Sequence, residues 1–128
     1  MVRPAMLSAL ERVARLRAEQ ELKKLAAFRR HVLAAHHQVE ASRAAMAQSY
    51  AAQAPLSVAE ARMANAQAGR AARDLARAQA DLARMQPRFD QMRERAGREL
   101  GRAEVLSRMA ETALLAVRQR RERGQMEE

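Results

Sequence analysis

The chain has 128 residues, of which 48% are hydrophobic and only 2% aromatic, and it contains no cysteine. The missing cysteines exclude disulfides, thiolate metal sites and cysteine nucleophiles, and the scarcity of aromatic rings argues against a thick globular core. The formal net charge of +9 predicts attraction to acidic surfaces without specifying their kind.

A first long helix is predicted over residues 4–50. Pro4 suits a first helical turn, because the amide proton it lacks would have no partner there. Glu11 and Arg12 interrupt the N-terminal residues, so a secretory signal is not expected. No stretch approaches the roughly 18 apolar residues of a membrane span. We therefore expect a cytoplasmic protein without membrane insertion.

The apolar pattern of this helix is that of a coiled coil. Apolar or small residues recur at spacings that alternate between three and four, which defines a heptad seam. The seam comprises Leu25, Phe28, Val32, Ala35, Val39, Ser42 and Met46. Leu16 and Leu22 lie off this seam, so a stutter in the heptads is expected near the N-terminus.

A turn is predicted at residues 51–56, because Pro55 disfavours helix in the residue before it. The sequence S-V-A-E that follows is a capping box. In this motif the Ser57 hydroxyl accepts from the amide of Glu60, and the Glu60 carboxylate accepts from the amide of Ser57. The second helix is therefore expected over residues 57–123.

The second helix repeats the heptad seam over a longer stretch. Its seam comprises Ala61, Ala64, Ala68, Ala71, Leu75, Ala78, Leu82, Met85, Phe89, Met92 and Ala96. Leu100 departs from it by one place, which predicts a second stutter. Pro87 should kink the helix because it removes one hydrogen bond and crowds the preceding turn. A full break at Pro87, giving three helices, is the alternative.

The fold class expected is therefore all-α: an antiparallel coiled-coil hairpin in one domain, residues 1–128. Reversal of the chain about Pro55 places large residues opposite small ones, as in Val39 with Ala71, and the bulkiest layer would contain Phe28 with Leu82. On this register Pro4 reaches only Leu106, so roughly twenty C-terminal residues would extend past the first helix, at 1.5 Å of rise each. Such an extension offers an apolar strip and a basic cluster to a partner.

Catalysis is not expected. His31, His36 and His37 lack the spacing of three or four that two metal-binding histidines on one helix face need, so neither a metal site nor a cofactor is predicted. A two-helix rod has no cleft in which a base could activate a serine. No glycine-rich phosphate loop is present.

Two rows of arginine on the second helix raise nucleic-acid binding as an alternative. The rows comprise Arg70, Arg77, Arg84 and Arg98, and Arg88, Arg95 and Arg102. Acidic residues such as Asp81 and Glu99 interrupt the rows, and aromatic residues for base stacking are scarce. A solvated coiled-coil face is favoured, and a generic structural adaptor for another helical protein is the third possibility.

The chain resembles the FliJ and YscO family of flagellar and type III secretion export proteins. The likeness covers nearly the whole length. It comprises the start M-L-S-A-L-E-R-V-A-R-L-R, an Ala- and Gln-rich turn entering L-S-V-A-E, and a basic C-terminal helix containing V-R-Q-R-R-E-R.

The resemblance implies an antiparallel coiled coil similar to the central stalk of rotary ATPases. The end that carries both termini would enter the hexameric export ATPase at the cytoplasmic face of a membrane export apparatus. Export chaperones and the export gate would be further partners. The residues expected to meet a partner are Met6, Leu7, Leu10, Leu114, Leu115, Val117, Arg118, Arg120, Arg121 and Arg123.

Overall fold

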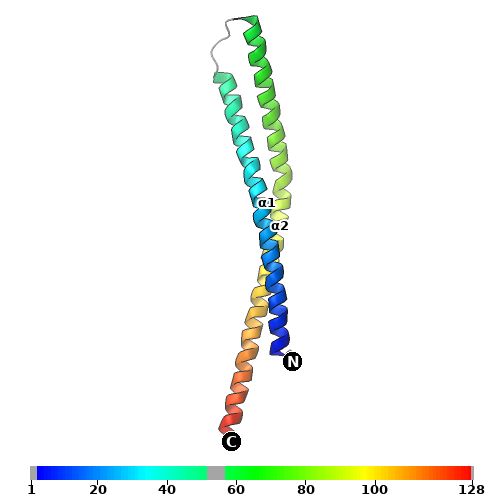
Figure 1. Cartoon of the computed structure of the whole chain (residues 1–128), viewed down its shortest axis with the longest axis vertical. Coiled ribbons are helices and arrows are strands. Elements are labelled where there is room, and N and C mark those ends of the chain that lie inside the picture. The colour runs from blue at the N-terminus through cyan, green and yellow to red at the C-terminus, as the bar shows by residue number, and fades with distance from the viewer. Residues whose placement is uncertain (1–2, 52–56, 128) are drawn as a thin grey trace. The chain divides into compact units, whose positions relative to one another are not determined.

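The computed structural model describes residues 3–51 and 57–127, and it consists of two α-helices (Figure 1). Helix α1 spans Pro4–Ala51 and has 48 residues, and helix α2 spans Val58–Glu127 and has 70. The two helices pack against each other, and no described residue lies in a strand. The all-α class and the longer second helix are confirmed. The predicted turn falls on residues 52–56, which lie outside the described residues, and on Ala51, which belongs to α1.

Ser57 caps helix α2. The amide of Glu60 donates to the Ser57 hydroxyl oxygen at 3.1 Å, and the amide of Ala61 donates to the Ser57 carbonyl at 3.0 Å. The first bond satisfies one of the amides that have no partner in the first turn of a helix. This half of the predicted capping box is therefore present.

Helix α2 continues through Pro87. The three-helix alternative is therefore wrong. Pro87 is exposed, so its ring points away from the partner helix, and the carbonyl of Ala83 loses the amide that would ordinarily bond to it. Tertiary packing on both sides of the proline offsets this cost, since Met85 and Phe89 are both partly buried.

The chain divides into two compact units, each built from a part of both helices. We call Ala27–Asp90 the hairpin unit, and Met1–Ala26 with Gln91–Glu128 the terminal unit. In each unit a segment of α1 runs antiparallel to a segment of α2.

In the hairpin unit the helices are paired one heptad away from the expected register. Phe28 stacks on Phe89, with ring centroids 6.3 Å apart and planes inclined by 20°. Phe89 lies seven residues beyond Leu82, the partner expected for Phe28. Counted from this pair, the position opposite Val39 is Ala78 instead of Ala71, and both Val39 and Ala78 are buried. Figure 1 shows α2 extending beyond the end of α1 at the tip of this unit. The expected layers were therefore wrong by one heptad, although a and d positions still meet.

The buried stripe of each helix keeps its spacing without a stutter. On α1 the least exposed positions alternate by three and four from Pro4 to Ser49, and on α2 they do so from Ala61 to Val117. Leu16, Leu22 and Leu100 are exposed beside the stripe rather than part of a shifted one. The predicted stutters were therefore wrong, because the seam continues in register through alanine and glutamate instead of leucine.

Within the described residues, neither helix contains a stretch that is long and apolar enough to cross a membrane.

Candidate protein-binding surface of the terminal unit

Small side chains form the buried centre of the helix interface in the terminal unit. Ala14, Ala18 and Ala103 make a buried cluster, against which the partly buried Leu106 packs. Ala96 is the most buried residue of this seam, with 2% of its surface exposed. Alanine buries little apolar area, so the hydrophobic stabilisation per heptad is smaller here than in a leucine seam.

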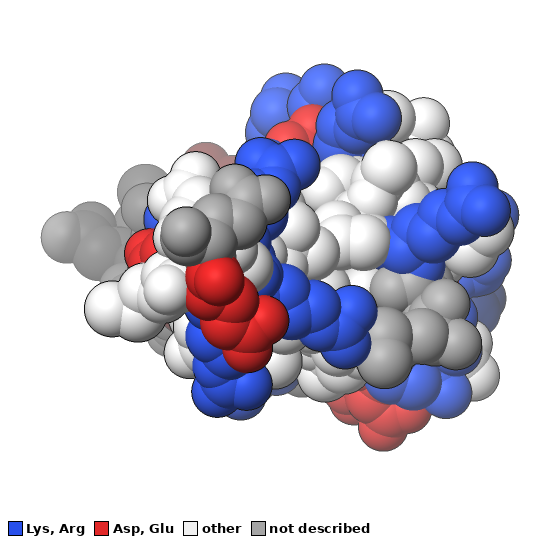
Figure 2. All heavy atoms as spheres, turned by 90° about the horizontal axis from the view of Figure 1, so that it is seen from below, with Lys and Arg blue, Asp and Glu red and all other residues white. Residues whose placement is uncertain are grey.

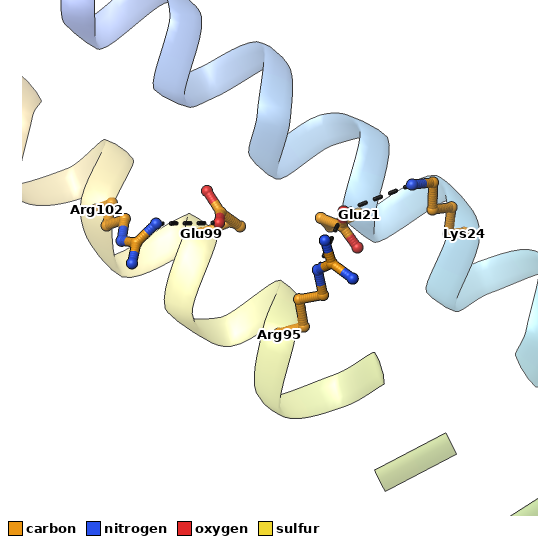
Figure 3. Close-up of polar contacts among 5 residues, drawn as sticks. All are labelled: Glu21, Lys24, Arg95, Glu99 and Arg102. Atoms are coloured by element: carbon orange, nitrogen blue, oxygen red, sulfur yellow. Dashed lines mark hydrogen bonds and ion pairs between the residues drawn. The ribbon is translucent and has the colours of Figure 1, made fainter. Parts of the chain in front are cut away.

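Three glutamates occupy seam positions beside these alanines: Glu11, Glu21 and Glu99. The Glu21 carboxylate of α1 lies 3.6 Å from Lys24 Nζ on its own helix and 3.6 Å from Arg95 Nε on α2 (Figure 3). Its side chain is only 14% exposed, whereas that of Arg95 is 67% exposed. The ion pair therefore joins the helices at the edge of the seam, where water screens much of the attraction.

Glu99 forms a similar pair within α2, since its carboxylate accepts from Arg102 at 3.3 Å (Figure 3). The Glu11 carboxylate accepts from Arg15 on α1. Each seam glutamate thus has a cation beside it, which allows a charged group to occupy a mostly covered position.

The large apolar side chains of the terminal unit lie mostly outside its seam. More than 40% of the surface of each of the following is exposed: Met6, Leu10, Val13, Leu16, Leu22, Leu100, Val105, Met109, Leu114, Leu115 and Met126. In the hairpin unit the same property is confined to Leu33, Tyr50, Val58 and Met63 among the described residues. Exposed apolar surface that is gathered in one region of a protein marks an interaction site more often than scattered residues do.

Part of this apolar surface forms a groove along one flank of the terminal unit. A hollow of about 550 Å³ contains Leu10 and Val13 of α1 and Val105 of α2. A second hollow of about 800 Å³ continues from Val105 to Met109 and Val117. Because Val105 lines both hollows, they are neighbouring parts of one feature, which we call the arginine-rimmed groove.

Basic residues border the groove. Arg17 and Arg102 line the smaller hollow, and Arg3, Arg108 and Arg120 line the larger one. Glu99 is the only acidic residue among the described residues that line either hollow, and it is paired with Arg102. The space-filling view from below shows Lys and Arg side chains bordering neutral surface on several sides, with fewer Asp and Glu side chains between them (Figure 2).

The opposite flank has a different charge. There Leu22 and Leu100 line a smaller hollow of about 320 Å³ together with Glu11, Glu19 and Glu104, and Arg15 is the only basic residue among the described ones that line it. The terminal unit therefore presents a basic apolar flank and a mainly acidic one.

The structure separates the residues that were expected to contact a partner into three groups. Met6, Leu10, Leu114 and Leu115 are exposed. Leu7 is 5% exposed and belongs to the seam, and Val117 is half-buried, so both are held by the helix pair and only border the larger hollow. The four arginines of the last turns, Arg118, Arg120, Arg121 and Arg123, are exposed, and Arg120 borders that hollow.

The predicted C-terminal extension is shorter than expected. Arg3 and Pro4 line the larger hollow together with Ala116, Val117 and Arg120, whereas Pro4 was expected to reach only Leu106. Val117 is the last partly buried residue of α2, and residues 118–127 are all exposed. The expectation was wrong because the one-heptad shift carries the N-terminus of α1 further along α2.

The other candidates from the sequence are placed on the surface. His31, His36 and His37 are exposed, and within the described residues no three His, Asp or Glu side chains are grouped to hold a metal ion. Three arginines of the two rows on α2 lie in ion pairs: Arg84 with Asp81, Arg95 with Glu21 and Arg102 with Glu99. These pairs reduce the positive charge that the rows offer to a phosphate backbone.

Sequence reasoning missed Val13, Val105 and Met109 as members of a shared surface. They become visible once the heptad is continued through Ala14 and Ala103, because they then occupy positions that flank the seam. Exposed flanking positions of a coiled coil are usually charged. Large apolar residues there were the available indication of a binding surface.

No protein-family model, curated protein or solved structure matches the chain.

Proposed function

We propose that the protein is a non-enzymatic coiled-coil adaptor that binds a partner protein through its terminal unit. The observation that carries this proposal is the exchange of roles between side chains in that unit. Alanine and glutamate occupy most positions of its seam, while most of its leucine, valine and methionine side chains are exposed around it. A coiled coil that needed only its own stability would place the larger residues inside, where each contributes about 1.5–3 kcal/mol.

We further propose that the partner is the ATPase ring of a flagellar or type III protein export apparatus. The resemblance of the sequence to the FliJ and YscO family supports this choice of partner. The exposed Leu114 and Leu115 and the arginines of residues 118–123 are the contacts that we assign to the ring. Export chaperones and the export gate are further proposed partners of the same apparatus.

The experiment is to mix the purified protein with the export ATPase of the same organism and to measure co-elution and ATP hydrolysis. We expect a complex and a change in hydrolysis rate. A double variant, Leu114→Gln with Leu115→Gln, should weaken the complex at least about tenfold, since central apolar contacts dominate protein interfaces.

The matched control is Leu33→Gln with Val58→Gln, which changes two exposed apolar residues of the hairpin unit. It should leave binding unchanged. Absence of co-elution and of any effect on hydrolysis by the unmodified protein would rule out this partner. Salt-sensitive binding to duplex DNA in its place would support the nucleic-acid alternative.

A further inference from the structure

We infer that the arginine-rimmed groove binds one amphipathic helix whose apolar face is bordered by carboxylates. Neither Leu114 nor Leu115 lines the groove, and the inference does not require the partner to be an export ATPase. A third helix in this place would complete a local three-helix bundle on the terminal unit.

The apolar floor of the groove suits a helix. Leu10 and Val13 are three residues apart on α1, and Val105 and Met109 are four apart on α2, so each pair lies on one face of its helix. Val105 is 55% exposed and Met109 46% exposed in the unbound protein, which leaves area to cover. Apolar residues of an added helix at spacings of three and four would pack between these rows.

The length of the groove sets the length of its occupant. The lining residues of α2 extend from Glu99 to Arg120, which corresponds to about 30 Å at 1.5 Å per residue. A helix of about twenty residues would therefore cover the groove from end to end.

The charge of the rim decides the charge of the occupant. Among the described residues, Arg17 and Arg108 form no ion pair, so their guanidinium groups remain available to carboxylates of a bound helix. Arg3 and Arg120 extend the positive border to the end of the groove. Opposite charges at the rim accelerate association and exclude basic competitors.

The same border disfavours a second copy of the chain packing groove to groove. Such a dimer would bring two sets of these arginines together, and like charges placed face to face cost several kcal/mol. The apolar floor alone would allow either occupant, so the charge is what selects an acidic helix.

The test uses two synthetic helical peptides of 21 residues. Both carry leucine at spacings of three and four, and the positions beside the leucines are glutamate in one peptide and lysine in the other. Fluorescence anisotropy of each labelled peptide is measured against the full-length protein. We expect the acidic peptide to bind at least about tenfold tighter than the basic one, and raising the salt concentration to weaken it.

The double variant Val105→Gln with Met109→Gln should reduce affinity for the acidic peptide at least about tenfold. Its matched control is Leu22→Gln with Leu100→Gln, which alters two residues of similar exposure on the opposite flank and should leave affinity unchanged. Circular dichroism of both variants verifies that helix content is retained.

Equal binding of the two peptides, equal loss in both variants, or no binding of either peptide would overturn the inference. So would a dimer in sedimentation equilibrium that Val105→Gln with Met109→Gln abolishes, because the occupant would then be a second copy. Failure of the ATPase experiment leaves the peptide result intact, and loss of peptide binding leaves the ATPase contact through Leu114 and Leu115 standing.

Discussion

The ring of Phe28 has two neighbours on α2, and together they define the register of the hairpin unit. Phe89 stacks on it, and the Arg88 guanidinium carbon lies 5.5 Å from its centroid. Stacked aromatic pairs contribute about 0.5–1.5 kcal/mol beyond the area they bury, and an arginine over a ring adds to this. These contacts exist only in the observed register.

A double-mutant cycle therefore tests the register. Phe28→Ala combined with Phe89→Ala should show a coupling energy of about 1 kcal/mol in urea unfolding followed by circular dichroism. The cycle of Phe28→Ala with Leu82→Ala serves as the control and should give a coupling near zero, because these positions lie one heptad apart in the structure. The opposite result, with coupling to Leu82 and none to Phe89, would indicate the register centred on Pro55.

Single residues also explain which parts of the structure could be predicted from the sequence. The heptad pattern and the Ser57 cap are local, so both helices and their antiparallel packing could be predicted. The register could not, because Ala71 and Ala78 on α2 are seven residues apart, and Leu75 and Leu82 are too. A slide of one heptad therefore still sets Val39 opposite an alanine and Ala35 opposite a leucine. The two registers differ clearly only where α2 carries different residue types seven positions apart, as at Leu82 and Phe89, either of which could face Phe28.

The candidate site was predicted in part. The exposed Leu114 and Leu115 were found from the sequence, whereas the floor of the groove was not. The seam of α2 runs through the buried Ala103 and Ala110, so that Val105 and Met109 lie beside the seam and line the groove. Large apolar residues alone do not reveal a seam that is made of alanine. The position of a flanking residue depends on a seam that the small residues define.

At the scale of the element, helix α2 tolerates Pro87 in its interior. A proline in this position has no amide proton to donate to the carbonyl of Ala83, and its ring crowds the same turn. Together these effects cost about 3 kcal/mol in an isolated helix. The unbroken α2 therefore depends on contacts with α1 around the proline.

Pro87→Ala should raise the free energy of unfolding by about 1–3 kcal/mol, because it restores the hydrogen bond in a helix that is already formed. Gly97→Ala is the comparison: Gly97 lies in the same helix, and an added Cβ would point into open space. That variant should gain about 1 kcal/mol from helix propensity alone. Urea unfolding measures both, and a Pro87→Ala variant that is no more stable than the unmodified chain would mean that α2 does not form across this position.

At the scale of the whole molecule, the C-terminal segment of α2 consists of a packed part and an exposed part. Ala110 is buried and Ala113 and Val117 are partly buried in the seam, whereas residues 118–127 are exposed. The segment that was expected to extend free of α1 is therefore two segments, one that stabilises the helix pair and one that is available to a partner.

Two truncations separate these segments. A chain that ends at Val117 should unfold within about 0.5 kcal/mol of the full-length protein, since residues 118–127, which it lacks, are exposed. A chain that ends at Ser107 should lose about 2 kcal/mol or more, because the segment it lacks contains the buried Ala110 and the partly buried Ala113 and Val117. Urea unfolding measures both free energies. In the ATPase co-elution assay, the chain that ends at Val117 should bind the ATPase ring more weakly than the full-length protein, because it lacks the arginines of residues 118–123. Equal stability of the two truncations would mean that α2 beyond Ser107 does not pack on α1.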